Sequence, residues 1–330
     1  MVDFRYHLVS LVSVFLALAL GIILGAGPLQ NSIGDTLSGQ VDTLRTSRDE
    51  ARAELSQTQT VLEGSEGALA IAGEQLLPGT LTDRNIAIVV LPGASADTVS
   101  GLEKDLDLSG ANVSAQITLT SAFADSAKGT YRGALASQLQ EYVEGLPENP
   151  TNDQVIAGAI DVVLRNGPDD PNAKILLGSL TSEEDALFSV DREITAPADA
   201  ILFIAPATLY PEDDDLASED RAEIEAQSGI FTNAFDTSAS RGPTVALGRA
   251  LEDNDLLVAL RDTKNGSTVD SVGTVSSQIN VPLAIAAELT DSHVALGTEQ
   301  RSEAALGQRI EAPRPAENPA DSAPEDDAQD

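Results

Sequence analysis

The feature that most constrains this chain is an uncharged, apolar run close to its start, from Leu8 to Leu29. The run holds 22 residues. At about 1.5 Å of rise per residue, a helix of this length can cross a hydrocarbon core of about 30 Å. We therefore predict a transmembrane helix over residues 8–29, preceded by a short N-terminal segment, residues 1–7.

The distribution of positive charge predicts the orientation of this helix. Arg5 precedes the apolar run, and the next basic residue is Arg45, well beyond it. Because cytoplasmic flanks carry the excess of Lys and Arg, residues 1–7 are expected in the cytoplasm and the body of the chain outside it. The chain is thus predicted to be a single-pass membrane protein.

A cleaved signal peptide is the alternative interpretation of the same run. Three small residues near its end would suit a cleavage site: Gly25, Ala26 and Gly27. The apolar core of a signal peptide spans only about 7 to 15 residues, however, so the length of this run favours an anchor that is retained.

One face of the predicted membrane helix carries small residues at every fourth position, namely Ser13, Ala17, Gly21 and Gly25. Such a face lets two helices approach closely within lipid, where no hydrophobic driving force brings them together. We expect this face to pair with a second copy or with a partner helix. Gly and Ala are also common in membrane helices generally, which is the alternative explanation.

Composition excludes several functions for the rest of the chain. The formal net charge is −34, so no basic surface is available to bind a nucleic-acid backbone. There is no Cys, which excludes disulfides and thiolate metal sites. The only Met is Met1, and the only His residues are His7 and His293.

Residues 30–77 show a heptad repeat that predicts a coiled coil. The a positions are Val41, Arg48, Leu55, Leu62, Leu69 and Leu76, and the d positions begin with Leu37 and Leu44 and continue with Ala51, Thr58, Ser65 and Ala72. Apolar residues spaced by seven are typical of a helix that pairs with another helix. The alternative is a single amphipathic helix that folds back on its own domain. Pro78 and Gly79 end the helix in either case.

Residues 80–306 alternate short β-branched runs with helical patterns, which predicts an α/β domain with a mostly parallel, Rossmann-like sheet. The expected strands are Asn85–Leu91, Asn112–Leu119, Ala200–Ile204, Thr244–Gly248 and Ser267–Val272. The expected helices are Ala96–Leu108, Arg132–Leu146, Thr151–Arg165, Ser218–Phe235, Asn254–Leu260 and Val275–Leu289, the last interrupted at Pro282. Residues 307–330 are rich in Pro, Ala and acid, and are predicted to be disordered.

Few residues suggest chemistry in this domain. The loop Pro92–Ser95 lacks a phosphate-binding glycine pattern, no serine lies in a GxSxG elbow, and the run Glu212–Asp215 lacks the spacing of a calcium loop. Asp270 and Ser271 end a predicted strand and form the best candidate for a ligand crevice, with a helix cap as the alternative. We predict no enzymatic activity, no cofactor and no metal site.

Three segments resemble the actinobacterial MctB family, called SteB in corynebacteria. They are VDFRYHLVSLVSVFLALALGIILGAGPL at the start, the strand NIAIVVLPG and the late segment STVDSVGTVS. The resemblance implies one of two functions. The first is copper homeostasis through an outer-membrane pore. The second is control of peptidoglycan hydrolysis and cell separation together with a SteA-type membrane partner.

The residues themselves favour the second function. Copper prefers Cys, Met and His, which this chain almost lacks. A pore-forming barrel needs many long alternating strands, whereas the predicted strands are few and short. The sequence therefore predicts an envelope protein that acts by protein contact, as a homodimer or hetero-oligomer through its coiled coil. Copper homeostasis and an extracytoplasmic ligand-binding module are the alternatives.

Overall fold

The computed structural model describes residues 4–26, 28–182, 185–206 and 218–315, with only the backbone given for residues 25–26, 28–38 and 218–219. The chain divides into two units, Met1–Ser65 and Glu66–Asp330, which are considered separately. The acidic run Glu212–Asp215 and the last part of the predicted tail, residues 316–330, lie outside the described residues.

The first unit holds helix α1 (Phe4–Ala26) and most of helix α2 (Pro28–Leu76). Residues Phe4–Leu24 are long and apolar enough to cross a membrane. This helix begins earlier than the predicted 8–29 and ends before Leu29, because Pro28 starts α2. Proline suits a first helical position, since it has no N–H to leave unpaired there. Part of the segment expected to precede the helix, residues 4–7, is thus helical.

The second unit is built on a seven-stranded sheet with the order β3-β2-β1-β4-β5-β6-β7. All neighbouring strands are parallel except β2 and β3, which are antiparallel. The strands are β1 (Asn85–Val90), β2 (Asn112–Leu119), β3 (Phe188–Arg192), β4 (Ala200–Ile204), β5 (Thr244–Leu247), β6 (Ser267–Val269) and β7 (Ala295–Leu296). The predicted parallel α/β sheet is therefore confirmed. The two strands at its edges were not predicted.

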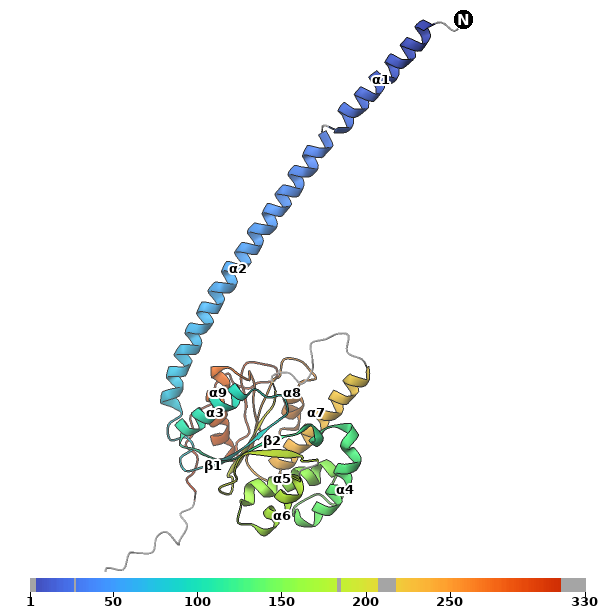
Figure 1. The fold of residues 1–330 in the computed structure, drawn as a ribbon. Coiled ribbons are helices and arrows are strands. Elements are labelled where there is room, and N and C mark those ends of the chain that lie inside the picture. The colour runs from blue at the N-terminus through green and yellow to red at the C-terminus, as the bar shows by residue number, and fades with distance from the viewer. Residues whose placement is uncertain (1–3, 27, 183–184, 207–217, 316–330) are drawn as a thin grey trace, which may run out of the picture. The chain divides into compact units, whose positions relative to one another are not determined.

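Side chains of the central strands alternate between two apolar cores, as the period of a strand requires. In β1, Ala87 and Val89 face one core while Ile86, Ile88 and Val90 face the other. The second of these cores is closed by α3 (Ala96–Ser109) and α9 (Val275–Glu288) (Figure 1). The first is closed by α4 (Gly129–Leu139), α5 (Asn152–Asn166), α6 (Pro171–Leu180), α7 (Ser218–Ala239) and α8 (Leu256–Thr263).

Three helix predictions differ from the structure. Pro282 lies inside a continuous α9 and does not interrupt it. Its neighbours Val281 and Leu283 are almost wholly buried, so packing offsets the hydrogen bond that proline cannot make. The predicted helix Arg132–Leu146 ends early, as α4 followed by the 3-10 turn Gln140–Tyr142. Helix α6 was not predicted; Asp170 caps it and Pro171 starts it.

The last turns of α2 belong to the second unit and pack on α9. Leu77 is fully buried in a small cluster with Ile279 and Leu283, and Leu69 is half-buried against the same cluster. Gly73 makes this approach possible, because a Cβ there would lie 2.8 Å from Ile279 Cδ1. Leu69, one of the predicted coiled-coil contacts, thus packs against its own domain. At this end of α2 the fold-back alternative is correct.

Residues 307–315 also pack on this junction, so the predicted disorder from residue 307 is wrong for them. The Arg309 guanidinium donates to the carbonyls of Leu76 (3.1 Å) and Pro78 (3.0 Å). The Ala312 N–H donates to Thr80 O at 2.8 Å. The composition of this segment, rich in proline and acid, does not predict these contacts, because they are made by backbone groups and one arginine. A cation beside the last carbonyls of a helix also stabilises its C-terminus.

We predict that Leu77→Ala lowers the free energy of unfolding of the second unit by about 2 to 5 kcal/mol, the cost of a cavity in a packed core. Leu55→Ala is the matched control: Leu55 is 58% exposed, and its loss should change that free energy by less than about 0.5 kcal/mol. Urea unfolding of the full chain in detergent, followed by circular dichroism, measures both. Equal midpoints for the two variants would contradict the described packing.

Candidate functional site

The order of the sheet places its topological reversal between β1 and β4, where doubly wound folds usually bind ligands. The loop after β1 contains Gly93, whose φ of 85° suits glycine. A Cβ on Gly93 would lie 3.6 Å from Pro206 Cβ, so the loops after β1 and β4 approach closely. The described parts of these loops, residues 91–95 and 205–206, contain no charged side chain and no metal ligand.

Asp270, the first residue of the predicted crevice, lies just after β6 and is fully buried. Its Oδ2 accepts from Arg261 Nη2 at 2.9 Å and from the Glu299 N–H at 3.1 Å. Its Oδ1 accepts from Ser271 Oγ at 2.7 Å and from the Thr298 N–H at 2.9 Å. A carboxylate offers about four lone-pair positions, and all are occupied within the chain. Asp270 therefore stabilises the fold and has no acceptor left for a ligand.

Ser271 is held in the same network and does not cap the following helix. Its N–H donates to Glu299 Oε1 at 3.1 Å, and its φ is 59°. The cap of α9 is Thr274, whose hydroxyl accepts from the Ser277 N–H. Asp270 and Ser271 thus form neither the predicted ligand crevice nor the helix cap. They stabilise the fold instead.

The space beside Asp270 is filled by residues that follow β7. A Cβ on Gly297 would lie 1.8 Å from Asp270 Oδ1, so only glycine fits at this position. The next residues, Thr298 and Glu299, supply the two backbone donors to Asp270. The chain itself therefore closes the carboxyl end of β6.

We predict that Asp270→Asn destabilises the second unit by about 3 to 5 kcal/mol, because it leaves the buried Arg261 without its anionic partner. Asp262→Asn is the control, since Asp262 is 67% exposed in its ion pair with Arg301 and should cost less than about 1 kcal/mol. Thermal unfolding of the full chain checks both. A wild-type stability for Asp270→Asn would instead reopen this position as a ligand site.

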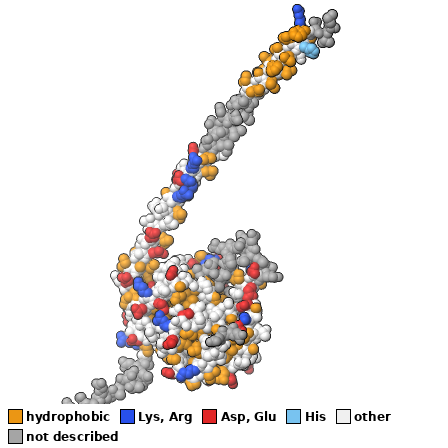
Figure 2. Space-filling view, viewed as in Figure 1, with side chains coloured by type: hydrophobic (Ala, Val, Ile, Leu, Met, Phe, Trp, Pro, Cys, Tyr) orange, Lys and Arg blue, Asp and Glu red, His pale blue; other side chains and the backbone are white. Residues whose placement is uncertain are grey.

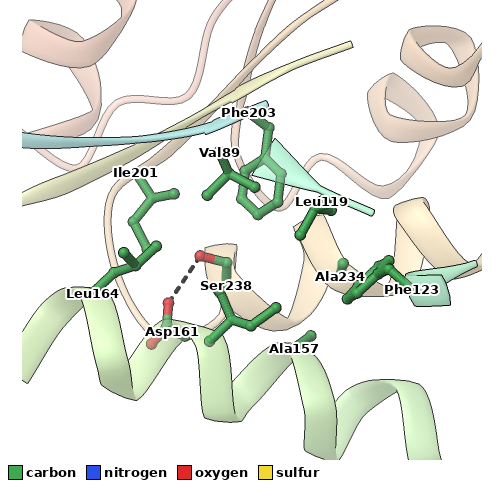
Figure 3. A pocket seen from close by; sticks show the side chains of 11 residues that line it. Val89, Leu119, Phe123, Ala157, Asp161, Leu164, Ile201, Phe203, Ala234 and Ser238 are labelled. Carbon is green, nitrogen blue, oxygen red and sulfur yellow. Dashed lines mark hydrogen bonds between the residues drawn. The ribbon is translucent and has the colours of Figure 1, made fainter. Parts of the chain in front are cut away.

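A second buried carboxylate, Asp161 on α5, also accepts its hydrogen bonds from residues of the same chain. Its Oδ1 accepts from Arg165 Nε and Ser238 Oγ, both at 2.9 Å, and its Oδ2 accepts from Arg241 Nε at 2.7 Å. Figure 3 shows Asp161 and Ser238 meeting at the edge of an otherwise apolar cavity. Measured to the centre of a water molecule, the cavity is about 10 Å³. That is room for one water and for no larger ligand.

Copper ligands are sparse in this structure. Among the described residues, no three His, Cys, Asp or Glu side chains form a group that could hold a metal ion. His293 Nδ1 lies 2.8 Å from Oε1 of the buried Glu288, an isolated pair. Soft copper sites use several sulfur or imidazole ligands, which this pair does not supply.

The two helices of the first unit carry the remaining predicted contact residues. Ser13, Ala17 and Gly21 of α1 are exposed, and nothing lies within 4 Å of a Cβ built on Gly21. On α2 four apolar residues of the heptad are also exposed: Val41 by 43%, Leu44 by 69%, Leu55 by 58% and Leu62 by 57%. Figure 2 shows hydrophobic side chains on the surface of this helix. The burial of Gly25 and the side chain of Leu37 are not described, and Leu76 is half-buried. Pairing by either helix remains a prediction.

Comparison with known proteins identifies the family. The model of the family described as copper transport outer membrane protein, MctB, matches residues 1–306. This chain belongs to the MctB family. Relatives named Copper transporter MctB from Mycobacterium bovis and two strains of Mycobacterium tuberculosis are 27% identical to it over 126 residues. That stretch covers 38% of this chain and 40% of each relative, so the match spans less than half of the relatives' length.

The resemblance read from the sequence is therefore confirmed, whereas the buried ion pairs were missed. One signal of them was available. Asp161 and Arg165 are four residues apart on α5, a spacing at which opposite charges on a helix can pair. Arg261 and Asp270 gave no comparable signal, because they are joined by tertiary contacts between α8 and the end of β6.

Proposed function

We propose that this protein contributes to copper homeostasis in the cell envelope and that it does so as a membrane-tethered, protein-binding component. The copper function rests on membership of the MctB family and on the name Copper transporter MctB that its relatives carry. None of these names refers to cell separation, so copper homeostasis replaces it as the main function.

The observation that carries the protein-binding part is the exposed apolar row on α2. Four large apolar side chains at a and d positions are exposed and belong to none of the buried cores of the described residues: Val41, Leu44, Leu55 and Leu62. Helices of this length with an apolar row normally bury it against another helix. The row is therefore the surface that a partner helix would cover.

A second copy is the partner that the membrane segment favours. If α1 spans the bilayer, every copy is anchored in the same orientation and its α2 leaves the membrane in the same direction. Two copies can then pair in parallel, with Leu55 facing Leu55 and Arg48 facing Arg48. The second contact has a cost, since arginine at an a position specifies register while lowering stability. The contact between Arg48 and Asp49 at 2.7 Å partly offsets the charge.

The residues that could handle copper directly do not support a conducting role for the domain. The whole chain has no Cys, one Met and two His. The strands of the second unit form an open sheet covered by helices on both faces. We therefore propose that this chain uses α1 and α2 to bind a partner or assembly that handles copper itself.

Complementation of a strain that lacks the gene tests both parts. Cellular copper should rise in the deletion strain and return to normal with the wild-type chain. The double variant Leu55→Asp, Leu62→Asp should fail to restore it, because charge at two a positions prevents helix pairing. The matched control Ser56→Asp, Thr60→Asp places the same charges on other positions of α2 and should restore normal copper. Total cell copper by mass spectrometry is the measurement.

Different results of this experiment would contradict the two parts of the proposal. Normal copper in the deletion strain would contradict a role in copper homeostasis. Full complementation by the Leu55→Asp, Leu62→Asp variant, at wild-type protein levels, would instead contradict action through the α2 row.

A further inference from the structure

The two edges of the sheet differ in how they are protected. At one edge, β7 is covered by the chain that follows it: Ala304 forms a parallel bridge with Leu296, and the Glu303 N–H donates to Ala295 O at 2.7 Å. At the other edge, β3 pairs with β2 alone. Within the part of the chain that the structure describes, no segment is paired to the outer side of β3.

The hydrogen-bond pattern determines which groups of β3 face outward. The Thr120 N–H donates to Leu187 O at 2.9 Å, and Ser189 is the residue opposite Thr118. Since backbone groups alternate along an antiparallel strand, Leu187 and Ser189 face β2, and Val190 presents its N–H and C=O to the open edge. No described residue bonds to Val190 on that side.

A groove adjoins this edge on the α6 side. It has a volume of about 330 Å³ and is lined by apolar side chains from three elements: Val163 of α5, Leu177 of α6, Val190 of β3 and Ile194 just after β3. The volume lies at the lower end of the range of about 300 to 1,000 Å³ that is usual for ligand pockets. It suits one or two side chains of a peptide better than a large cofactor.

Two charged side chains of opposite sign line the groove and could pair with charges of a ligand. Lys174 and Glu193 line it, both are exposed, and neither forms an ion pair with another described residue. The charges of β3 itself are engaged elsewhere, because Arg192 pairs with Glu103 and Asp191 accepts from Thr118. They do not block the edge in the way that charged edge strands usually do.

We propose that the open edge of β3 and the adjoining groove bind an extended peptide segment of a partner protein as an added strand. The backbone of the segment pairs with Val190, and one apolar side chain enters the groove between Leu177 and Ile194. An acidic side chain of the segment faces Lys174, and a basic one faces Glu193. This mode obtains affinity from main-chain hydrogen bonds and specificity from the pocket beside the edge.

The charges favour a partner protein over the end of this chain as the occupant. The end of this chain, AENPADSAPEDDAQD over residues 316–330, has no apolar side chain larger than those of Ala and Pro and no basic residue for Glu193. Self-pairing of β3 would place a second copy of this strand at the edge, and the experiment below distinguishes it.

The test uses the full chain in lipid nanodiscs and a library of random heptapeptides displayed on phage. Selected peptides should share an apolar central residue flanked by one acidic and one basic residue. Their binding should be lost with Val190→Pro, which removes the outward N–H at a position where an edge strand tolerates proline. A synthetic peptide of the selected consensus should bind the Lys174→Glu, Glu193→Lys variant roughly tenfold more weakly. The control Lys104→Glu changes an exposed lysine on α3 and should bind as wild type.

Three results would overturn the proposal. The first is a selection that enriches no sequence, and the second is a set of peptides that bind wild type and Val190→Pro equally. The third is a disulfide-linked dimer of Val190→Cys in the membrane, which would assign the edge to a second copy because the chain has no other cysteine.

Discussion

The close approach of α2 to α9 at Gly73 is the contact on which the organisation of this protein depends. Ile279 occupies the space that a side chain at position 73 would need, and Leu77 is buried in the same cluster as Ile279. The contact fixes the last turns of α2 as part of the folded domain, and Arg309 reinforces it from the C-terminal side. The same contact divides the leucine row of α2. Leu69 packs on the domain, while Val41, Leu44, Leu55 and Leu62 are exposed.

The domain has the strand order of a doubly wound ligand-binding sheet but uses its polar residues differently. Asp270 and Asp161 would be obvious ligand-binding groups on such a sheet, and each is instead saturated by arginine, hydroxyl or backbone donors. Buried carboxylates of this kind tie distant segments together, here α8 to the end of β6 and α5 to the end of α7. The surfaces that we propose to bind partners therefore lie on the outside, along α2 and at the edge of β3.

The sequence predicted the regular parts of this structure well, because their signals are local. Strands β1 and β4 are almost wholly apolar, β2 and β5 contain β-branched residues, and helix α1 is recognisable by its long, uncharged apolar run. Strand β3 was missed because FSVDR is mostly polar, and β7 because it has two residues.

Long-range contacts account for the other errors. Pro282 was read as an interruption although packing of α9 overrides it, and residues 307–315 were read as disordered although Thr80 and Leu76 supply their partners. Gly73 is a poor helix former by propensity, but in the folded chain its lack of a side chain admits Ile279. The candidate site at Asp270 failed for the same reason, since its partners come from residues far along the chain.

The central claim is that α2 pairs with a second copy along Val41 to Leu62 and with its own domain beyond Leu69. Because the chain contains no cysteine, single cysteines can test this by oxidative cross-linking in native membranes. Leu55→Cys should give a disulfide-linked dimer, since a residues face each other in a parallel pair. Ser56→Cys, one position away, and Leu69→Cys, at the domain, should not. Absence of the Leu55→Cys dimer, or equal cross-linking at all three positions, would contradict the account.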